Sequence, residues 1–521
     1  MCGIFAYLSS TREDLEKLKG CGMRSNHRGP DSTNELIIEN ETNFIYFLFH
    51  RLAINGLDEK GNQPMKLKEN DNTVLICNGE IYNYKELSEE LDIQLETGSD
   101  CEIILHLYEK SKLNDYHSYY LNHFIHKLDG VFSFIIYDKL INQVVIGHDP
   151  FGIRPLYWSH DTINNKYAFS SEMKCLVDLT TDIQFYPPGS FTIIDLNKNT
   201  HKTHTFYPMI YEKIVETNES KIVQVIQTKL KKAVQKRLIS DRPFGCLLSG
   251  GLDSSIITAL VCQNVEPSKV RTFAIGLEGS PDLLSAQKVA DYLGTNHTSV
   301  IVSEKEMLEA IDSTIYQIES KDTTTIRASV PMFLLSKYIR DNTDIKVILS
   351  GEGSDEASGS YLYFHNAPNP TAFQNECIRL LKDVRFFDVL RGDKTTAGAG
   401  LEVRVPYFDK EFMEYYMGID PKKKVVRDGM EKYLLRKAFE EYLPEEIVWR
   451  RKDGFSDGVS SFEKPWYEII DEFTIKNYEM NEKEYYFSVF QKYYPGHEDI
   501  IPYYWMPKWS KENNPSGRLI V

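Results

Sequence analysis

The pattern of apolar residues changes near residue 210, and this change limits what the chain can fold into. Up to about residue 200, short β-branched and aromatic runs follow one another closely, among them CGIFAYL, FIYFLF, TVLICNG, GVFSFIIYD, QVVIGHD and SFTIIDL. From about residue 220, apolar strands alternate with helical patterns. A chain of 521 residues is also long for one hydrophobic core. The sequence therefore predicts two domains, 1–205 and 220–521, joined by a polar linker at 206–219.

The first domain is predicted to contain mainly antiparallel sheet covered by a few helices. Its strand candidates are bounded by Gly, Asn and Asp and lie close together in sequence. Short connections suit antiparallel neighbours, whereas parallel strands need long crossovers. Helical patterns occur at REDLEKLKGCGM, YKELSEEL and DCEIILHLYEK.

The second domain is predicted to be an α/β domain with a doubly wound parallel sheet. It opens with KIVQVIQTKLKKAVQKRLI, where Ile222, Ile226, Leu230 and Val234 recur at helical spacing. The strand candidates FGCLL, RTFAIGL, TSVIV and KVILSG then alternate with helices, one of which starts at Asp282. This alternation is typical of parallel sheets. The lysine run at 422–424 is expected to be a solvated face.

Composition excludes several classes of protein. The net charge of −16 argues against a nucleic-acid binder, because phosphate neutralisation needs a basic surface. The eight cysteines are scattered without zinc spacing, which predicts reduced thiols in the cytoplasm. No apolar run approaches the roughly 20 residues of a membrane span, and the start lacks a secretory signal. We therefore expect small-molecule partners, and we expect neither nucleic acid nor a membrane as a partner.

The stretch LLSGGLDSS predicts a phosphate-binding loop between a strand and a helix. Paired glycines let backbone N–H groups approach an anion, and a helix that begins near Asp253 adds its unsatisfied amides. No lysine follows the glycines, so this is not a Walker loop. The candidate ATP contacts here are Leu248, Ser249, Gly250, Gly251, Asp253, Ser254 and Ser255.

A second stretch, ILSGEGSDE, repeats this arrangement at Ser350, Gly351, Glu352 and Asp355. Because both stretches follow strands of one parallel sheet, we expect them at the same carboxyl edge, where ligands of such sheets bind. A carboxylate repels phosphate unless a metal ion lies between them. Asp253 and Asp355 are therefore candidate Mg²⁺ ligands on a pyrophosphate.

The chain begins MCGIFAY, and Cys2 has two possible explanations. A buried strand can use cysteine as a small apolar residue. Alternatively, removal of Met1 would place a thiol and a free α-amine on the same residue, so that the amine could act as base for the thiol near neutral pH. The residue by itself does not decide between them.

Nine motifs resemble one family. SGGLDSS, SPDLLSAQKVADYLG, TTIRASVPM, SGEGSDE and GLEVRVPYFD resemble the synthetase domain of asparagine synthetases, an ATP-pyrophosphatase type of domain. MCGIF, NHRGPD, NGEIYN and TGSDCE resemble the N-terminal-nucleophile glutaminase domain of class II amidotransferases. The resemblance implies an αββα sandwich of antiparallel sheets followed by a doubly wound parallel-sheet domain, and it favours the nucleophile explanation of Cys2.

The resemblance also implies roles for residues of the first domain. Cys2 attacks the amide of glutamine, while Asn78 and the Gly79 N–H form the oxyanion hole. Arg51 binds the carboxylate of glutamine and Asp100 binds its ammonium group. The other implied glutamine contacts are Leu52, Ala53, Ile54, Asn55, Gly79 and Glu80.

In the second domain, the resemblance implies that Leu248 and Ile275 contact adenosine, together with backbone groups of Ser350 and Gly351. Glu352 is implied as the base that deprotonates incoming ammonia, and Lys452 as a partner of the phosphate charge. Thr324 and Arg327 are candidate contacts of aspartate or pyrophosphate.

The implied activity is synthesis of asparagine from aspartate, with glutamine as the nitrogen donor and ATP cleaved to AMP and pyrophosphate through a β-aspartyl-AMP intermediate. Ammonia is expected to pass through a channel, because in water it would be protonated and no longer nucleophilic. A relative that amidates a different carboxylate stays an alternative, as does a relative that only binds nucleotide or glutamine. The sequence leaves open whether the chain forms a homodimer.

Overall fold

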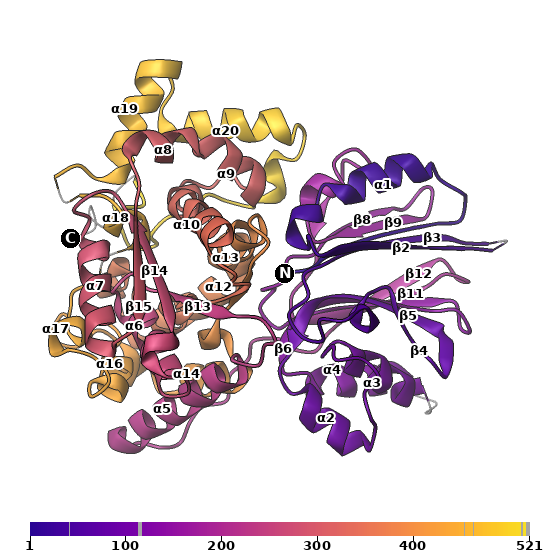
Figure 1. The fold of residues 1–521 in the computed structure, drawn as a ribbon, viewed down its shortest axis with the longest axis horizontal. Coiled ribbons are helices and arrows are strands. Elements are labelled where there is room, and N and C mark those ends of the chain that lie inside the picture. The colour runs from indigo at the N-terminus through magenta and orange to yellow at the C-terminus, as the bar shows by residue number, and fades with distance from the viewer. Residues whose placement is uncertain (41, 113–116, 453, 462, 512–513, 517–521) are drawn as a thin grey trace. The chain divides into compact units, whose positions relative to one another are not determined.

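The computed structural model describes the whole chain except residues 41, 113–116, 453, 462, 512–513 and 517–521 (Figure 1). Two compact units emerge: Met1–Met209 with Ile239–Arg242, and Ile210–Leu238 with Pro243–Val521. The predicted linker at 206–219 contains the division at Met209, and no helix or strand occurs between residues 206 and 218. The final residues of the predicted second domain, 517–521, lie outside the described residues.

The first unit contains two six-stranded sheets in which every paired strand is antiparallel. One sheet has the order β10 (Gln184–Phe185), β8 (Tyr157–Asp161), β9 (Lys166–Ser170), β1 (Gly3–Ser9), β3 (Phe44–Arg51) and β2 (Ser32–Glu39). The other has the order β12 (Thr200–Thr205), β11 (Ser190–Asp195), β7 (Gln143–His148), β6 (Gly130–Asp138), β5 (Asn70–Ile81) and β4 (Met65–Leu67).

Helices cover the outer faces of both sheets, which confirms the predicted αββα arrangement. Figure 1 shows α1 (Leu15–Met23) outside the first sheet and α2 (Tyr84–Leu91), α3 (Glu102–Lys112) and α4 (His117–Lys127) outside the second. Apolar side chains of both sheets form one core between them, including Ile4 and Phe47 from the first sheet and Ile76 and Ile135 from the second. Helix α4 was not predicted from the sequence.

The pairing of β1 with β3 places two predicted glutamine-site residues at one end of the first sheet. Gly3 lies opposite His50 in this antiparallel pair. The residues that follow in register, Cys2 and Arg51, therefore lie at the same end of the strands. Strand β3 is buried along its whole length, and Arg51 is its last residue.

The second unit contains a parallel five-stranded sheet, as predicted. Its order is β15 (Asn296–Ile301), β14 (Arg271–Gly276), β13 (Phe244–Leu247), β16 (Val347–Leu349) and β17 (Glu402–Arg404). Strand β13 is first in sequence and central in space, with β14 on one side and β16 on the other. Successive strands are therefore added on one side of β13 and then on the other, and such switch points are where open parallel sheets bind ligands.

Helices lie on both sides of this sheet, so it is doubly wound. Figure 1 shows α6 (Leu252–Cys262) and α7 (Pro281–Leu293) on one side and α10 (Thr323–Asn342) and α13 (Asp388–Ala397) on the other. The remaining helices are α5 (Glu219–Lys236), α8 (Glu304–Glu309), α9 (Ile311–Ile318), α11 (Ser354–Ser358), α12 (Pro370–Asp383), α14 (Lys410–Gly418), α15 (Pro421–Lys424), α16 (Tyr433–Phe439), α17 (Glu445–Val448), α18 (Phe455–Gly458), α19 (Trp466–Tyr478) and α20 (Glu482–Tyr493). No helix among the described residues has both the length and the apolar character to cross a membrane.

Helix α5 confirms the predicted amphipathic helix. Ile222, Ile226, Leu230 and Val234 are all buried on one of its faces. The lysine run at 422–424 was predicted to be solvated, and this prediction is wrong for Lys424. Lys422 is exposed, but Lys424 ends α15 with only 3% of its surface accessible. The short helix turns this lysine into the protein, where its Nζ lies 3.9 Å from the sulfur of Met417.

Candidate active sites

The first unit has a small cavity, of about 30 Å³, at the ends of β3 and β5. It gathers residues from five separate stretches of sequence. The predicted residues that line it are Cys2, Arg51, Leu52, Ala53, Ile54, Asn55, Gly79, Glu80 and Asp100. Phe49, Gly61, Gln63, Cys77, Ser99 and Cys101 complete the lining and were not predicted.

Arg51 presents a positive charge to this cavity without a carboxylate to neutralise it. Its Nη1 donates to the carbonyl of Asp58 at 2.6 Å and to Asn62 Oδ1 at 3.0 Å, and its Nη2 donates to the carbonyl of Gly56. These acceptors are neutral, and within the described part of the chain no carboxylate pairs with Arg51. The guanidinium is thus held in place while its charge stays available for an anionic ligand.

Two buried carboxylates line the same cavity. Asp100 accepts a hydrogen bond from the backbone N–H of Ile81 at 2.6 Å, and Glu80 accepts one from Asn55 Nδ2 at 2.7 Å. With Arg51, the cavity therefore offers both signs of charge. A zwitterion such as a free amino acid carries the complementary pair.

Asn78 does not line the cavity, although its strand neighbours Cys77 and Gly79 do. Its side chain is buried, and neither its Oδ1 nor its Nδ2 has a hydrogen-bond partner among the described residues. A buried amide without partners is costly, so such a group needs an explanation. The Cys2 thiol points to the carbonyl of Leu52, with 3.7 Å between Sγ and O.

The second unit has a larger cavity, of about 250 Å³, at the carboxyl edge of β13, β14 and β16. Both predicted loops reach it. The predicted residues in its lining are Leu248, Ser249, Gly251, Asp253, Ser254, Ile275, Thr324, Ser350, Gly351, Glu352, Asp355 and Lys452. Gly250, Ser255 and Arg327 do not appear in the lining.

The first loop has the backbone expected of an anion-binding turn. Gly250 has a φ of +72°, and a Cβ there would lie 2.3 Å from the carbonyl carbon of Ser285. Helix α6 then starts without a side-chain cap at Gly251, so its first amides are not satisfied by a capping residue. Ser249 and Ser254 face each other across the turn, with their Oγ atoms 3.2 Å apart.

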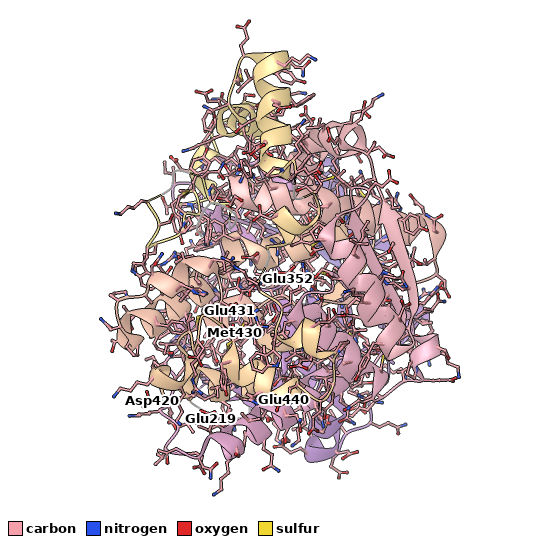
Figure 2. The ribbon with its side chains drawn as sticks, turned by 90° about the vertical axis from the view of Figure 1, so that its left-hand side faces the viewer. Glu219, Glu352, Asp420, Met430, Glu431 and Glu440 are labelled. Atoms are coloured by element: carbon pink, nitrogen blue, oxygen red, sulfur yellow. The ribbon has the colours of Figure 1, made fainter. Side chains whose placement is uncertain are left out.

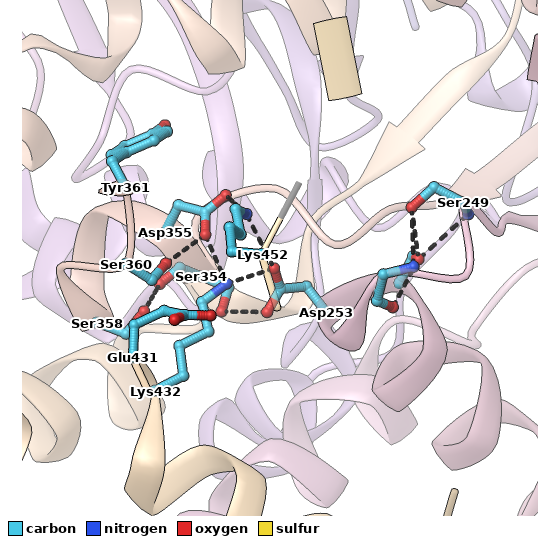
Figure 3. Close-up of polar contacts among 12 residues, drawn as sticks. Ser249, Asp253, Ser354, Asp355, Ser358, Ser360, Tyr361, Glu431, Lys432 and Lys452 are labelled. Carbon is cyan, nitrogen blue, oxygen red and sulfur yellow. Dashed lines mark hydrogen bonds and ion pairs between the residues drawn. The ribbon is translucent and has the colours of Figure 1, made fainter. Parts of the chain in front are cut away.

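Asp253 and Asp355 meet at two lysine ammonium groups (Figure 3). Lys432 Nζ donates to Asp253 Oδ2 and to Asp355 Oδ1, and Lys452 Nζ donates to Asp355 Oδ2 and lies 3.8 Å from Asp253 Oδ2. Burial alone would raise the pKa of Asp355, but the two lysines outweigh it and hold that pKa well below its usual range. The same contacts raise the pKa of Lys452 against the effect of burial.

The other end of the cavity is acidic around one arginine. Arg391 donates to Glu352 Oε2 at 2.6 Å, and its Nη1 lies 2.8 Å from Asp388 Oδ1. Burial raises the pKa of Glu352, Arg391 opposes this rise and Asp388 adds to it. Figure 2 shows Glu352 and Glu431 toward the centre of the unit, whereas Glu219, Asp420 and Glu440 lie toward one edge of the view.

Comparison with known proteins identifies the family. A profile described as asparagine synthase matches residues 225–374 and 366–513, and a glutamine amidotransferase domain matches residues 1–232. The glutamine-hydrolysing asparagine synthetase of Cricetulus griseus is 40% identical, covering 100% of this chain and 99% of its own. The chain belongs to the asparagine synthetase family. The human member is 38% identical with the same coverage, and the Gallus gallus member is 38% identical over 98% of its length.

Sequence reasoning missed Lys432 in this asparagine synthetase family member. Its φ of 60° lies in the left-handed region, which is unusual for lysine, and it precedes the first residue of α16. This backbone turn directs the ammonium group between the two loops. The neighbouring Asp428-Gly429 pair signals a turn in the sequence, but nothing local shows where the turn points.

Arg327 was predicted as a contact of aspartate or pyrophosphate, and in the structure it has other partners. Its guanidinium pairs with Glu482 and donates to Asn514 Oδ1 at 2.9 Å. Thr324, one turn earlier in α10, does line the cavity, and its buried Oγ1 has no hydrogen-bond partner in the part of the chain that the structure describes. The role of Arg327 at a ligand stays a prediction.

Asp253 and Asp355 supply some, but not all, of the ligands that a hard cation needs. Carboxylate oxygens are ligands that Mg²⁺ prefers, and both carboxylates already face one shared cation, the Lys432 ammonium. However, no group of three or more metal-ligating side chains occurs among the described residues. The protein therefore offers two ligands at this position, and phosphate oxygens would have to supply others.

Proposed function

We propose that this protein makes asparagine from aspartate, with glutamine as nitrogen donor and ATP cleaved to AMP and pyrophosphate. Residues 1–205 would hydrolyse glutamine and residues 220–521 would form β-aspartyl-AMP and transfer ammonia to it. The observation that carries the proposal is that this family member has two cavities. One contains a thiol and side chains of both charges, and the larger one lies at the switch point of a parallel sheet.

In the first unit, Arg51 binds the carboxylate of glutamine, and Asp100 and Glu80 face its ammonium group. The Cys2 thiol then attacks the side-chain amide, releases ammonia and forms a thioester that water hydrolyses to glutamate. Removal of Met1 gives Cys2 an α-amine that titrates near neutral pH and takes the thiol proton. The Gly79 N–H stabilises the oxyanion together with the Asn78 amide, which has no hydrogen-bond partner among the described residues and would have to turn toward the cavity that it does not line in this structure.

In the second unit, Leu248 and Ile275 border the adenosine and the Ser249–Ser255 turn holds the phosphates. Lys432 and Lys452 stabilise the charge that develops on pyrophosphate as the aspartate carboxylate attacks the α-phosphate. Glu352 accepts a proton from the ammonia that attacks the acyl-adenylate, and its raised pKa favours this. Thr324 Oγ1 and Glu356 Oε2 are buried oxygens without a hydrogen-bond partner among the described residues, and both are available to the amino-acid acceptor.

Asp253 and Asp355 would hold Mg²⁺, which neutralises phosphate charge when it is bound. The proposal is supported by the cation that these carboxylates share in the structure. We also propose a cytoplasmic location, since all eight cysteines are free thiols. A different carboxylate acceptor is the alternative to aspartate, because side chains outside the two loops select the acceptor.

A product assay tests the activity directly. With ATP, Mg²⁺ and either glutamine or ammonium, we expect AMP to appear in step with asparagine and only when aspartate is present. AMP formation with another acid in place of aspartate would favour the different-acceptor alternative. Formation of ADP, or no turnover at all, would contradict the proposal.

Substitution of the thiol tests the division of labour between the sites. Cys2→Ala should abolish synthesis from glutamine and leave synthesis from ammonium within about twofold of wild type, because the nitrogen is then supplied without hydrolysis. Cys262→Ala is the matched control, since Cys262 is the other partly exposed thiol and lines neither cavity. Loss of both activities in Cys2→Ala would contradict separate sites.

A further inference from the structure

A buried ionic cluster lies beside the first residues of β1. It consists of His27, Arg28, Glu172 and Lys174, and none of these is among the described residues that line the thiol cavity. Arg28 and Glu172 are fully buried and Lys174 is nearly so. Charges that are buried so completely and do not touch the substrate need an explanation, because their desolvation is costly.

The topology of the first sheet brings this cluster to Cys2. Strand β9 pairs antiparallel with β1, with Phe5 opposite Ser170. The chain that leaves β9 therefore runs back along the start of β1. Ser171 continues this pairing, because its N–H donates to the carbonyl of Ile4 and its Oγ accepts from the N–H of Ile4. Glu172 is the next residue, so it arrives beside the residues that precede β1.

Arg28 connects Glu172 to the backbone of Cys2. Its Nε donates to the carbonyl oxygen of Cys2 at 2.9 Å, and its Nη1 donates to Glu172 Oε1 at 2.6 Å. Gly29 permits this placement, since a Cβ there would lie 2.3 Å from the backbone of His50 in β3. The guanidinium therefore fixes the peptide plane that follows the proposed nucleophile.

The second carboxylate oxygen of Glu172 also has a cationic partner. Lys174 Nζ donates to Glu172 Oε2 at 2.7 Å, and His27 Nε2 lies 3.7 Å from Glu172 Oε1. Burial lowers the pKa of His27 against the opposing effect of Glu172, which disfavours the charged form of this imidazole. Glu172 thus accepts from two cations on its two oxygens, which leaves its carboxylate little freedom to rotate.

We infer that Glu172 is a positioning residue for the thiol of Cys2. It aligns Arg28, and Arg28 sets the carbonyl of Cys2, so that Sγ and the α-amine keep the orientation needed to attack glutamine. The inference rests on the proposed role of Cys2 as nucleophile. It assigns a function to the SSEMKC stretch that no sequence motif had suggested.

The test is Glu172→Gln, measured as glutamine hydrolysis and as synthesis from ammonium. A small displacement of a reacting group costs up to about 100-fold in rate, so we expect kcat for hydrolysis to fall by about 10- to 100-fold. KM for glutamine should change by less than about threefold, because Arg51 and Asp100 are untouched. Synthesis from ammonium should stay near wild type, which shows that the protein is folded.

Two further variants keep the result interpretable. Glu39→Gln is the matched control, because it removes an exposed ion pair with Arg12 and should leave both activities unchanged. If Glu172→Gln does not fold, Lys174→Met retains the contact between Arg28 and Glu172 but releases Oε2. It should lower kcat by about 2- to 10-fold, a smaller effect because the alignment is only weakened.

A purely structural role would give a different outcome. A variant that melts at lower temperature but keeps kcat for glutamine within twofold would overturn the inference, and so would a rise in KM without a fall in kcat. Wild type and Cys2→Ala are assayed in parallel. If Cys2→Ala still hydrolyses glutamine, the proposed nucleophile is wrong, and this result is distinct from a failure of Glu172.

Discussion

Lys424 should destabilise the protein, and replacing it with methionine should raise stability. Its ammonium group lies among Met417, Tyr416 and Cys377, with Nζ 3.9 Å from the sulfur of Met417 and 5.6 Å from the centre of the Tyr416 ring. Within the described part of the chain, no carboxylate forms an ion pair with it. A buried charge without an opposite partner is a net cost to folding.

The size of this cost follows from the pKa. Burial lowers the pKa of Lys424 from 10.5 to about 8. Each pKa unit corresponds to about 1.4 kcal/mol, so the charged form is disfavoured by about 3 kcal/mol in the folded state. Methionine has a similar length and no charge, so Lys424→Met should gain most of this amount at pH 7. At about 2 °C per kcal/mol for a large domain, the melting temperature should rise by about 4–7 °C.

The gain should depend on pH in a defined direction. Below pH 8 the lysine is protonated in both the folded and the unfolded state, and wild type bears the full cost. Between pH 8 and 10.5 the folded state loses the proton while the unfolded state keeps it, so the lysine's contribution to stability improves as pH rises. The difference between variant and wild type should therefore shrink toward zero by about pH 10.5.

Thermal melts of both proteins at pH 7, 8.5 and 10 provide the assay. Lys422→Met is the matched control, because it removes an exposed lysine of the same run and should change the melting temperature little at any of these pH values. The reasoning is refuted if Lys424→Met melts below wild type at pH 7, or if its advantage is the same at pH 7 and pH 10.

Three other substitutions give separate tests. Arg51→Lys loses the fork that binds a carboxylate, so KM for glutamine should rise at least about tenfold in steady-state assays while synthesis from ammonium is unchanged. Gly250→Ala places a Cβ against the backbone of Ser285 at a residue with positive φ, so calorimetry should show weaker ATP binding. Gly279→Ala is the control, because Gly279 also has a positive φ but has open space around it, and ATP binding should be unchanged. Lys432→Met removes one cation from Asp355, so the low pKa of that carboxylate should rise toward its usual value of 3.8. Asp355 should then stabilise the fold less above pH 3.8, and thermal melts should show that its contribution is fully lost at a higher pH than in wild type.

Periodicity and loop chemistry predicted the antiparallel and the parallel sheets and much of the larger cavity. The alternation of strands and helices after residue 220 is a local signal, and the carboxyl-edge rule then placed the loops at Asp253 and Asp355 on one side of the sheet. The structure bears this out, since both loops line one cavity. The cavity at Cys2 was predictable only through the family motifs, because Arg51 and Asp100 have no local signal of their own.

Side chains that depend on tertiary contacts escaped prediction. Lys432 reaches the loops only because its backbone is left-handed at the start of α16. Lys424 belongs to a run of three lysines, and the run itself gives no hint that one of them is buried. Arg327 was predicted to contact a ligand because of its motif, but it forms an ion pair with Glu482, which is 155 residues later in the sequence. In each case the deciding partner is distant in sequence.

The switch-point position of β13 also means that the larger cavity is completed late as the chain is being made. Ser354 contacts Asp253 across 101 residues, and Lys432 contacts it across 179. At about 5–20 residues per second, ribosomes need on the order of 10–35 s after Asp253 to deliver that lysine. At the site proposed for ATP, both lysine contacts of the two carboxylates are therefore made only after most of the chain has left the ribosome, so the proposed ligand would act on a nearly finished chain.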